Sequence, residues 1–139
     1  AARLQLFDAA FKRLVSIAWE EMCRQAVPLL AERLGGLELG PAGRFWSGGG
    51  PEWDVVAQAI DGRAVLLGEA KWIDGEPKAG TIESAARALL AKGVPPLQRS
   101  GDSTVHHALF VSRRPRGKFR LSVPNVHVID AADVLAVLK

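Results

Sequence analysis

Two apolar segments contain charged residues whose types and spacing suit metal-ion chemistry. Residues 53–60 and 64–72 have the apolar and β-branched composition of strands, and the Asp-Gly pair at 61–62 between them favours a tight hairpin turn. If these two residues form the whole turn, the register places Asp54 directly opposite Glu69. Opposed side chains of a hairpin lie on one face of the sheet, with Cβ atoms about 5 Å apart.

Two carboxylates placed in this way repel each other, so we expect a cation between them. An oxygen-only site with two carboxylates suits Mg²⁺ or Mn²⁺, which makes Asp54 and Glu69 the predicted metal ligands. Lys71 follows Glu69 by two residues and therefore lies on the same face of the strand. A bound metal ion can polarise a phosphoryl group and activate water, and a lysine can orient that water or neutralise developing charge. The spacing predicts a site for phosphodiester hydrolysis.

Simpler interpretations of the same residues remain open. Glu69 and Lys71 can form an ordinary ion pair on one strand face, which contributes little energy. Asp54 can be a residue at the start of a strand that accepts hydrogen bonds from backbone N–H groups. The apolar surroundings and the predicted register favour the metal site.

The first part of the chain predicts a long amphipathic helix. Apolar residues recur with helical spacing over residues 4–34, either as one helix or as two helices separated near Pro28. The Gly-Gly pair at 35–36 is a plausible stop. A short strand or loop and a glycine-rich turn follow, over residues 40–51.

The second half predicts two more helices and two more strands. Residues 81–92 have a helical pattern with Thr81 as a possible N-cap, and Asp130 can cap a terminal helix that ends at Leu138. Residues 106–112 and 126–129 are typical of strands. The whole chain, residues 1–139, is expected to be one mixed α/β domain. Because it begins without methionine and with residues typical of a helix interior, we expect it to be a piece of a longer protein.

Composition and charge narrow the class of protein. No apolar run approaches the roughly 20 residues of a membrane span, and no signal peptide is evident, so we expect a cytoplasmic protein without a membrane partner. The single cysteine, Cys23, excludes an internal disulfide and a Cys-based zinc site. The net charge of +3 is permissive of a polyanionic partner but weak evidence for one.

A basic stretch near the C-terminus is the strongest feature of the charge distribution. It can contact the phosphate backbone of a nucleic acid, or it can be a solvated loop, and the sequence favours neither interpretation. Its charged residues are Arg113, Arg114, Arg116, Lys118 and Arg120.

The segments EWDVVA (52–57) and LLGEAKW (66–72) resemble the two halves of the PD-(D/E)xK motif of the restriction-endonuclease-like superfamily. More narrowly, the chain is similar to the nuclease-like C-terminal domain of some archaeal and bacterial P-loop ATPases. Those domains have an aromatic-Glu-x-x-Cys-Arg helix, present here at residues 19–24, and an Arg-x-Trp segment, present at residues 44–46. The resemblance implies an αβββαβ core with a mixed central sheet flanked by helices, and it adds Glu20 as a carboxylate from the first helix.

The resemblance implies a magnesium-dependent endodeoxyribonuclease. Its site would consist of Glu20, Asp54 and Glu69 as carboxylates and Lys71 as the catalytic cation, with the basic stretch against DNA. Nothing predicts sequence specificity. One alternative is a catalytically inactive module that binds DNA or a P-loop ATPase domain of the same or another chain. Another is a dimerisation domain that uses the tryptophans as its interface.

Overall fold

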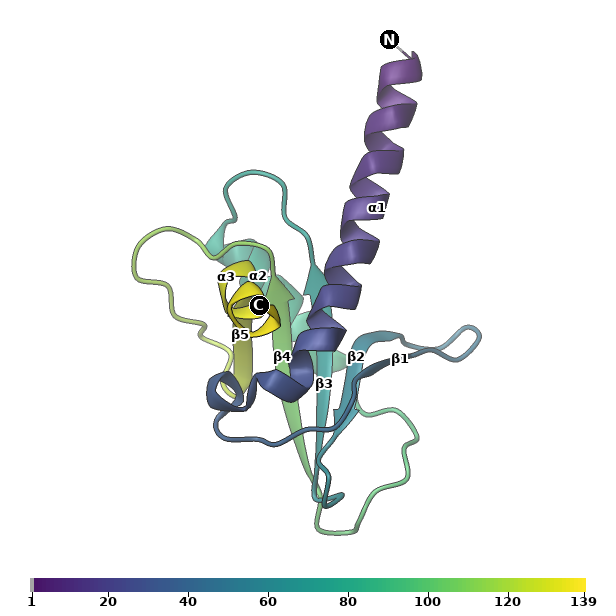
Figure 1. Ribbon diagram of the computed structural model, residues 1–139, viewed down its shortest axis with the longest axis vertical. Coiled ribbons are helices and arrows are strands. Elements are labelled where there is room, and N and C mark those ends of the chain that lie inside the picture. Colours follow the sequence, from purple (N-terminus) through teal and green to yellow (C-terminus); the bar gives the residue numbers. More distant parts are fainter. Residues whose placement is uncertain (1) are drawn as a thin grey trace.

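The computed structural model describes residues 2–139, and it has a mixed five-stranded open sheet flanked by helices (Figure 1). The strand order is β1-β2-β3-β4-β5, antiparallel from β1 to β3 and parallel from β3 to β5. The strands are β1 (Gly43–Phe45), β2 (Trp53–Gln58), β3 (Ala64–Lys71), β4 (Thr104–Val111) and β5 (Val126–Asp130). The helices are α1 (Ala2–Ala26), α2 (Ala79–Ala91) and α3 (Ala131–Leu138), with short 3₁₀ turns at Val27–Leu29 and Ala31–Leu34. This confirms the predicted α/β class and the order of elements.

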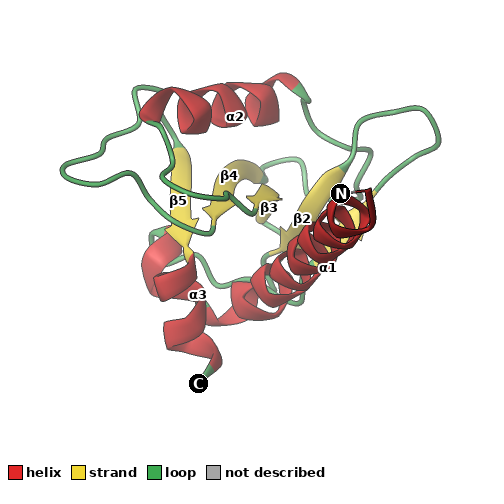
Figure 2. Cartoon of the chain, turned by 90° about the horizontal axis from the view of Figure 1, so that it is seen from above, coloured by secondary structure: helices red, strands yellow, loops and turns green. Residues whose placement is uncertain are grey.

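The sheet is covered on both faces. Helices α1 and α3 lie on one face and α2 lies on the other (Figure 2). Alternate residues of β3 point to the two sides: Leu66 packs with α1 and α3, whereas Leu67 packs with Leu89 of α2. Because both faces of the strand are buried, β3 reads as a continuous apolar run in the sequence.

The register of the β2–β3 hairpin agrees with the predicted one. Val55 pairs with Gly68 and Gln58 pairs with Val65, and the same register extended by one residue brings Asp54 level with Glu69. These two acids therefore lie at the end of the hairpin opposite its turn.

The turn itself differs from the two-residue turn expected at Asp61-Gly62, and that prediction was wrong. The Gly62 N–H donates to the carbonyl of Ala59 at 2.9 Å, so Ile60 and Asp61 are the central residues of the turn. A two-residue turn of the predicted type needs positive φ at both of its residues, but only Gly62 has it, at 75°. The Asp61 carboxylate instead accepts from the Arg63 N–H at 2.9 Å. The longer loop is centred on the same point, so the register is unchanged.

The helix boundaries are partly those expected. α1 ends at Ala26, and the chain continues as a 3₁₀ turn that contains Pro28, which confirms a break near this proline. Thr81 as the N-cap of the second helix was wrong. That position belongs to Lys78, because its carbonyl already accepts from the Thr81 N–H at 3.1 Å and closes the first turn earlier. Asp130 as the cap of α3 is confirmed.

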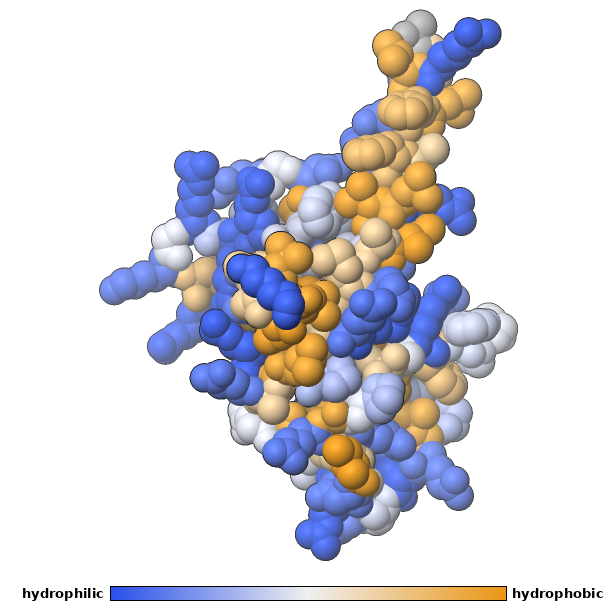
Figure 3. Space-filling view, viewed as in Figure 1, coloured by the Kyte–Doolittle hydropathy of each residue, from blue (hydrophilic) through white to orange (hydrophobic). Residues whose placement is uncertain are grey.

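The N-terminal half of α1 projects beyond the sheet, as Figure 1 shows. Apolar side chains lie along this part of the helix in the space-filling view (Figure 3), and Leu4, Leu6, Phe7, Phe11 and Leu14 are exposed. Within residues 2–139, no helix has the length and apolar character needed to cross a membrane.

Candidate functional site

Three carboxylates from three different elements gather at the end of the hairpin opposite its turn. Glu20 comes from α1, Asp54 is the second residue of β2, and Glu69 lies near the end of β3. We call these three residues the acid cluster. All three are half-buried, which is unusual for carboxylates unless their charges are compensated. Sequence reasoning named all three, and the fold brings Glu20 beside Asp54 and extends the hairpin register so that Asp54 is level with Glu69.

Asp54 connects the two strands to α1. Its Oδ2 atom accepts a hydrogen bond of 3.0 Å from the Ala70 N–H, and its backbone carbonyl accepts from the Arg24 guanidinium at 2.9 Å. The carboxylate thus accepts from a backbone N–H of β3 just beyond the Val55–Gly68 pair of the ladder. The backbone partner required by the simpler interpretation of Asp54 is present, and the same carboxylate also faces Glu20.

The contact between Glu20 and Asp54 is visible in the electrostatics. Burial raises the pKa of Glu20, and the neighbouring carboxylate of Asp54 raises it further. Arg24 and Arg44 oppose this increase. The neighbouring Glu21 behaves differently, because hydrogen bonds from Arg24 and Gln25 lower its pKa on the exposed helix surface. Of the two adjacent glutamates, Glu20 belongs to the acid cluster and Glu21 does not.

Lys92 completes the cluster, and sequence reasoning missed it. It is the C-cap residue of α2, and its ammonium forms an ion pair with the Glu69 carboxylate and donates to the backbone carbonyl of Glu52. Its Nζ atom also lies 6.0 Å from the centre of the Trp53 ring. Burial lowers the pKa of Lys92, while the charges of Asp54 and Glu52 counteract that decrease. Nothing in the local sequence marks this lysine, because α2 runs across the sheet and only that direction carries its end to β2 (Figure 2).

Lys71 lies at the edge of the cluster rather than within it. Its side chain is exposed and forms no ion pair with any of residues 2–139. Its backbone is fixed, because its carbonyl accepts from the Ser112 N–H at 3.2 Å. A free ammonium on a fixed strand end is available to a ligand outside the sheet, in contrast to Lys92, which is already paired.

The donor set of the acid cluster fits a hard divalent cation. Its ligands are all carboxylate oxygens, the donors that Mg²⁺ and Mn²⁺ prefer. The negative charge of Asp54 raises the pKa of Glu20 more than the nearby guanidinium group of either Arg24 or Arg44 lowers it. As the side chains stand, no three acidic, histidine or cysteine side chains among residues 2–139 converge on one point. The Glu69 carboxylate is instead paired with the Lys92 ammonium.

The predicted basic stretch separates into residues with different surroundings. Arg114 is engaged within the fold, where it donates to Asp130 at 3.0 Å and to Asp133 at 3.1 Å. Arg116 lies 3.4 Å from Glu76 in an exposed pair. The remaining cations are exposed and form no ion pair with the described residues: Arg113, Lys118 and Arg120. The stretch begins directly after Ser112, whose N–H bonds to the carbonyl of Lys71. The chain therefore leaves the sheet at the same end as the acid cluster.

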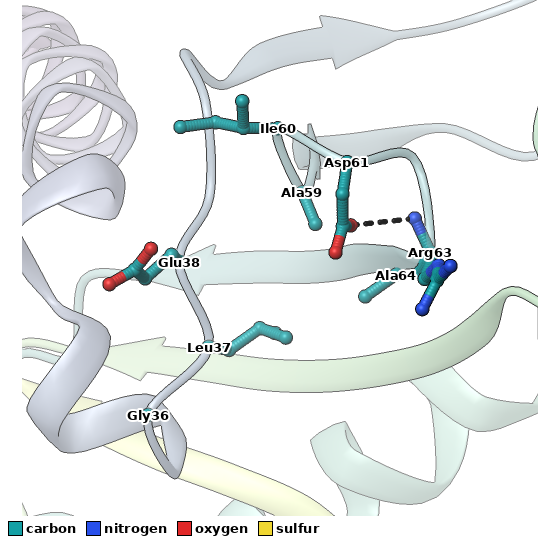
Figure 4. Close-up of a pocket in the computed structure, with 8 residues that line it drawn as sticks. All are labelled: Gly36, Leu37, Glu38, Ala59, Ile60, Asp61, Arg63 and Ala64. Carbon is teal, nitrogen blue, oxygen red and sulfur yellow. Dashed lines mark hydrogen bonds between the residues drawn. The ribbon is translucent and has the colours of Figure 1, made fainter.

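A hollow lies at the other end of the hairpin. It surrounds the turn and is lined by Leu37, Glu38, Ile60 and Arg63, among others (Figure 4). Its charged groups are on the surface, and none of the residues of the acid cluster contributes to it. We therefore place the candidate site at the strand ends and not in this hollow.

The tryptophans do not form one surface. Trp19 and Trp53 are buried, whereas Trp46 and Trp72 are partly exposed. Trp72 packs edge-on against Trp19, with 6.0 Å between ring centres, and Trp46 lies under the Arg44 guanidinium. The tryptophan interface imagined for a dimer would therefore have only two of the four side chains available.

Fold and site together define a mixed α/β domain with an acid cluster where a hairpin meets two helices. A family model described as archaeal and bacterial proteins of unknown function, DUF234, matches residues 2–84, and the chain belongs to that family. The matched segment contains Glu20, Asp54 and Glu69 but not Lys92. Neither the comparison with curated proteins nor that with solved structures gave a significant match.

Proposed function

We propose that this domain is a metal-dependent endonuclease with a restriction-endonuclease-like αβββαβ core, which hydrolyses phosphodiester bonds of DNA. The observation that carries the proposal is the approach of Glu20 of α1 to Asp54 of β2, at the end of the hairpin where the register also brings Glu69 of β3 level with Asp54. A core that needed only stability would gain nothing from two half-buried carboxylates side by side, because the repulsion between Glu20 and Asp54 opposes folding. The resemblance of segments 52–57 and 66–72 to the PD-(D/E)xK motif supports the same function.

The proposed roles follow from the position of each side chain. Asp54 and Glu69 would hold Mg²⁺ or Mn²⁺, and Glu20 would add a third carboxylate through its contact with Asp54. When bound, the metal ion supplies Lewis acidity and an activated water molecule. Lys71 is exposed at the same strand end, where its ammonium would orient that water or neutralise charge on the phosphate.

The basic stretch supplies the expected contact with the DNA backbone. Arg113, Lys118 and Arg120 are the cations with the greatest freedom to bind phosphate, since Arg114 is engaged within the fold. Such contacts position a duplex without reading its sequence. The proposed activity is therefore cleavage without base specificity from this stretch.

Metal binding tests the proposal most directly. We expect Mn²⁺ and Mg²⁺ to bind to the unaltered chain in calorimetry, and not to the Asp54→Ala, Glu69→Ala double variant. Nicking of supercoiled DNA should require the metal ion and be lost in the same variant. If the double variant binds metal as well as the unaltered chain, the site lies elsewhere and the proposal fails.

One observation favours a second function, a catalytically inactive module that binds DNA or a P-loop ATPase partner. The Lys92 ammonium already compensates the charge of Glu69, so the cluster can exist without a metal ion. DNA binding without metal-dependent nicking, at all metal concentrations tested, would establish this alternative.

A further inference from the structure

The position of Lys92 bears on how the acid cluster could accept a metal ion. Its ammonium forms the ion pair with Glu69 and bonds to the carbonyl of Glu52, the residue two before Asp54. The two side chains of this pair are largely enclosed, with 25% of Lys92 and 12% of Glu69 exposed. An ion pair shielded from water is screened less than one on the surface, and its partners exchange less readily with other ions.

The lysine is held in place by several features of the fold. Its backbone N–H donates to the carbonyl of Leu89, and the N–H of Gly93, which ends the helix with φ of 76°, donates to the carbonyl of Leu90. Leu89, one turn earlier, is fully buried against Trp53 and the sheet. The end of α2 is therefore anchored, and the Lys92 side chain reaches the cluster from a fixed point.

A metal ion and this ammonium compete for the same oxygen atoms. The carboxylate of Glu69 has both oxygen atoms free to coordinate a metal ion only if its bond to Lys92 is broken. The ammonium has a flexible four-carbon stem, so it can withdraw toward solvent without movement of the helix.

We propose that the Lys92 ammonium is a built-in cation of the acid cluster, which a divalent metal ion must displace from Glu69 in order to bind. This inference rests on the proposed metal site. It assigns to Lys92 a role in setting metal affinity, through its ion pair with Glu69.

The test is Mn²⁺ binding to the Lys92→Met variant of the full chain, measured by calorimetry at constant pH and salt. Methionine preserves most of the length of the side chain and removes its charge. We expect affinity at least about tenfold higher than in the unaltered chain, because a hydrogen bond to a charged group contributes roughly 1.5–3 kcal/mol and is no longer lost on metal binding. Tenfold corresponds to about 1.4 kcal/mol.

Lys78→Met is the matched control. It removes the same charge at the other end of α2, from an exposed side chain that forms no ion pair with the described residues. Its effect on affinity should be less than about twofold, the size expected for a solvent-exposed charge. An equal gain in both variants would show that only the general electrostatic field has changed, and would overturn the proposal.

Thermal denaturation gives a second readout that does not depend on calorimetry. Without metal, Lys92→Met should have a lower Tm than the unaltered chain, because Glu69 loses its partner. Added Mn²⁺ should raise the Tm of the variant more than that of the unaltered chain. The triple variant that also carries Asp54→Ala and Glu69→Ala should show no such rise.

The outcomes separate this inference from the proposed function. If the unaltered chain binds Mn²⁺ and Lys92→Met binds it no more tightly, the metal site stands and the role of Lys92 is wrong. If only Lys92→Met binds Mn²⁺, the role of Lys92 stands, and the unaltered chain is not a metal-dependent enzyme. If neither binds, both are wrong.

Discussion

Two clusters of charged residues at the same end of the sheet differ greatly in how far their charges are paired. The acid cluster contains Glu20, Asp54 and Glu69 with one close ammonium, that of Lys92. The second cluster, which we call the α3 cap cluster, consists of Asp130 and Asp133 with Arg33 and Arg114. In the first, one carboxyl group increases the pKa of another. In the second, acids and bases are equal in number and directly bonded.

The α3 cap cluster is built for stability. Asp130 and Asp133 form a reciprocal capping box, with bonds of 2.9 and 3.1 Å between the side chain of each and the backbone N–H of the other. Burial would raise the pKa of Asp133, but these bonds and the guanidinium groups of Arg114 and Arg33 outweigh burial and lower it. The folded state therefore favours the ionised form of Asp133, whereas it disfavours that of Glu20.

The difference separates residues that hold the fold together from residues kept at an energetic disadvantage. Stabilising features have their hydrogen bonds and charges paired, while functional sites retain groups that only a ligand satisfies. The contrast is measurable, because removal of a residue should affect stability in one cluster and activity in the other.

The largest expected effect is on activity in the acid cluster. Asp54→Asn should reduce metal-dependent nicking of supercoiled DNA by about 100-fold or more, because even residues that merely support metal ligands contribute 10- to 100-fold. The thermal midpoint should stay within a few degrees of the original, since asparagine can still accept the Ala70 N–H. Unchanged nicking with normal folding would remove Asp54 from the site.

The next largest effect is on stability in the α3 cap cluster. Asp133→Ala should decrease the free energy of unfolding by about 2 kcal/mol, through loss of the capping box and of the bond to Arg114. Urea denaturation measures this change. Glu20→Ala is the control from the acid cluster, and its effect should be near zero or stabilising because it removes repulsion from Asp54. Equal losses in both variants would contradict the comparison.

The contribution of the α3 cap cluster to stability should also depend on pH, with a smaller effect. The pKa of Asp133 is lowered on folding, so the stability it contributes is fully present above the pKa of the unfolded chain, about 3.9. That stability is lost as the pH falls from this value through the lower pKa of the folded state. The difference in unfolding free energy between the original chain and Asp133→Asn should therefore shrink between pH 5 and acid pH. A difference that is independent of pH would exclude this role of the carboxylate.

The smallest effect concerns the basic stretch. Replacing Arg113, Lys118 and Arg120 with alanine together should decrease the dependence of log DNA affinity on log salt by up to about 3, at close to one phosphate each. The thermal midpoint should not change. Arg114→Ala should do the reverse, with a lower midpoint and little change in salt dependence, because Arg114 bonds to Asp130 and Asp133. If Arg114→Ala alters the salt dependence most, the division of the stretch is wrong.

Much of the fold could be predicted because short sequence patterns determine its helices and strands. The helical period before Pro28, the two apolar strand runs and the Asp at 130 each act over a few residues, and the structure has the corresponding elements. The register of the hairpin was also predictable, although the turn was not. A four-residue loop centred on Asp61-Gly62 gives the same pairing as the expected two-residue loop, since both are symmetric about one point.

What the sequence by itself determined was the set of acids: Glu20, Asp54 and Glu69 lie in segments whose local patterns fix where each strand and helix runs. What only the tertiary structure decided was which cation joins them. Lys71 is the neighbour along the strand, but Lys92 is the neighbour in space, since the direction of α2 across the sheet is set by packing of Leu89 against Trp53. The division of the basic stretch has the same origin. Arg114 pairs with Asp130 and Asp133 at the start of α3, whereas the adjacent Arg113 forms no ion pair with the described residues, and no local pattern encodes this difference.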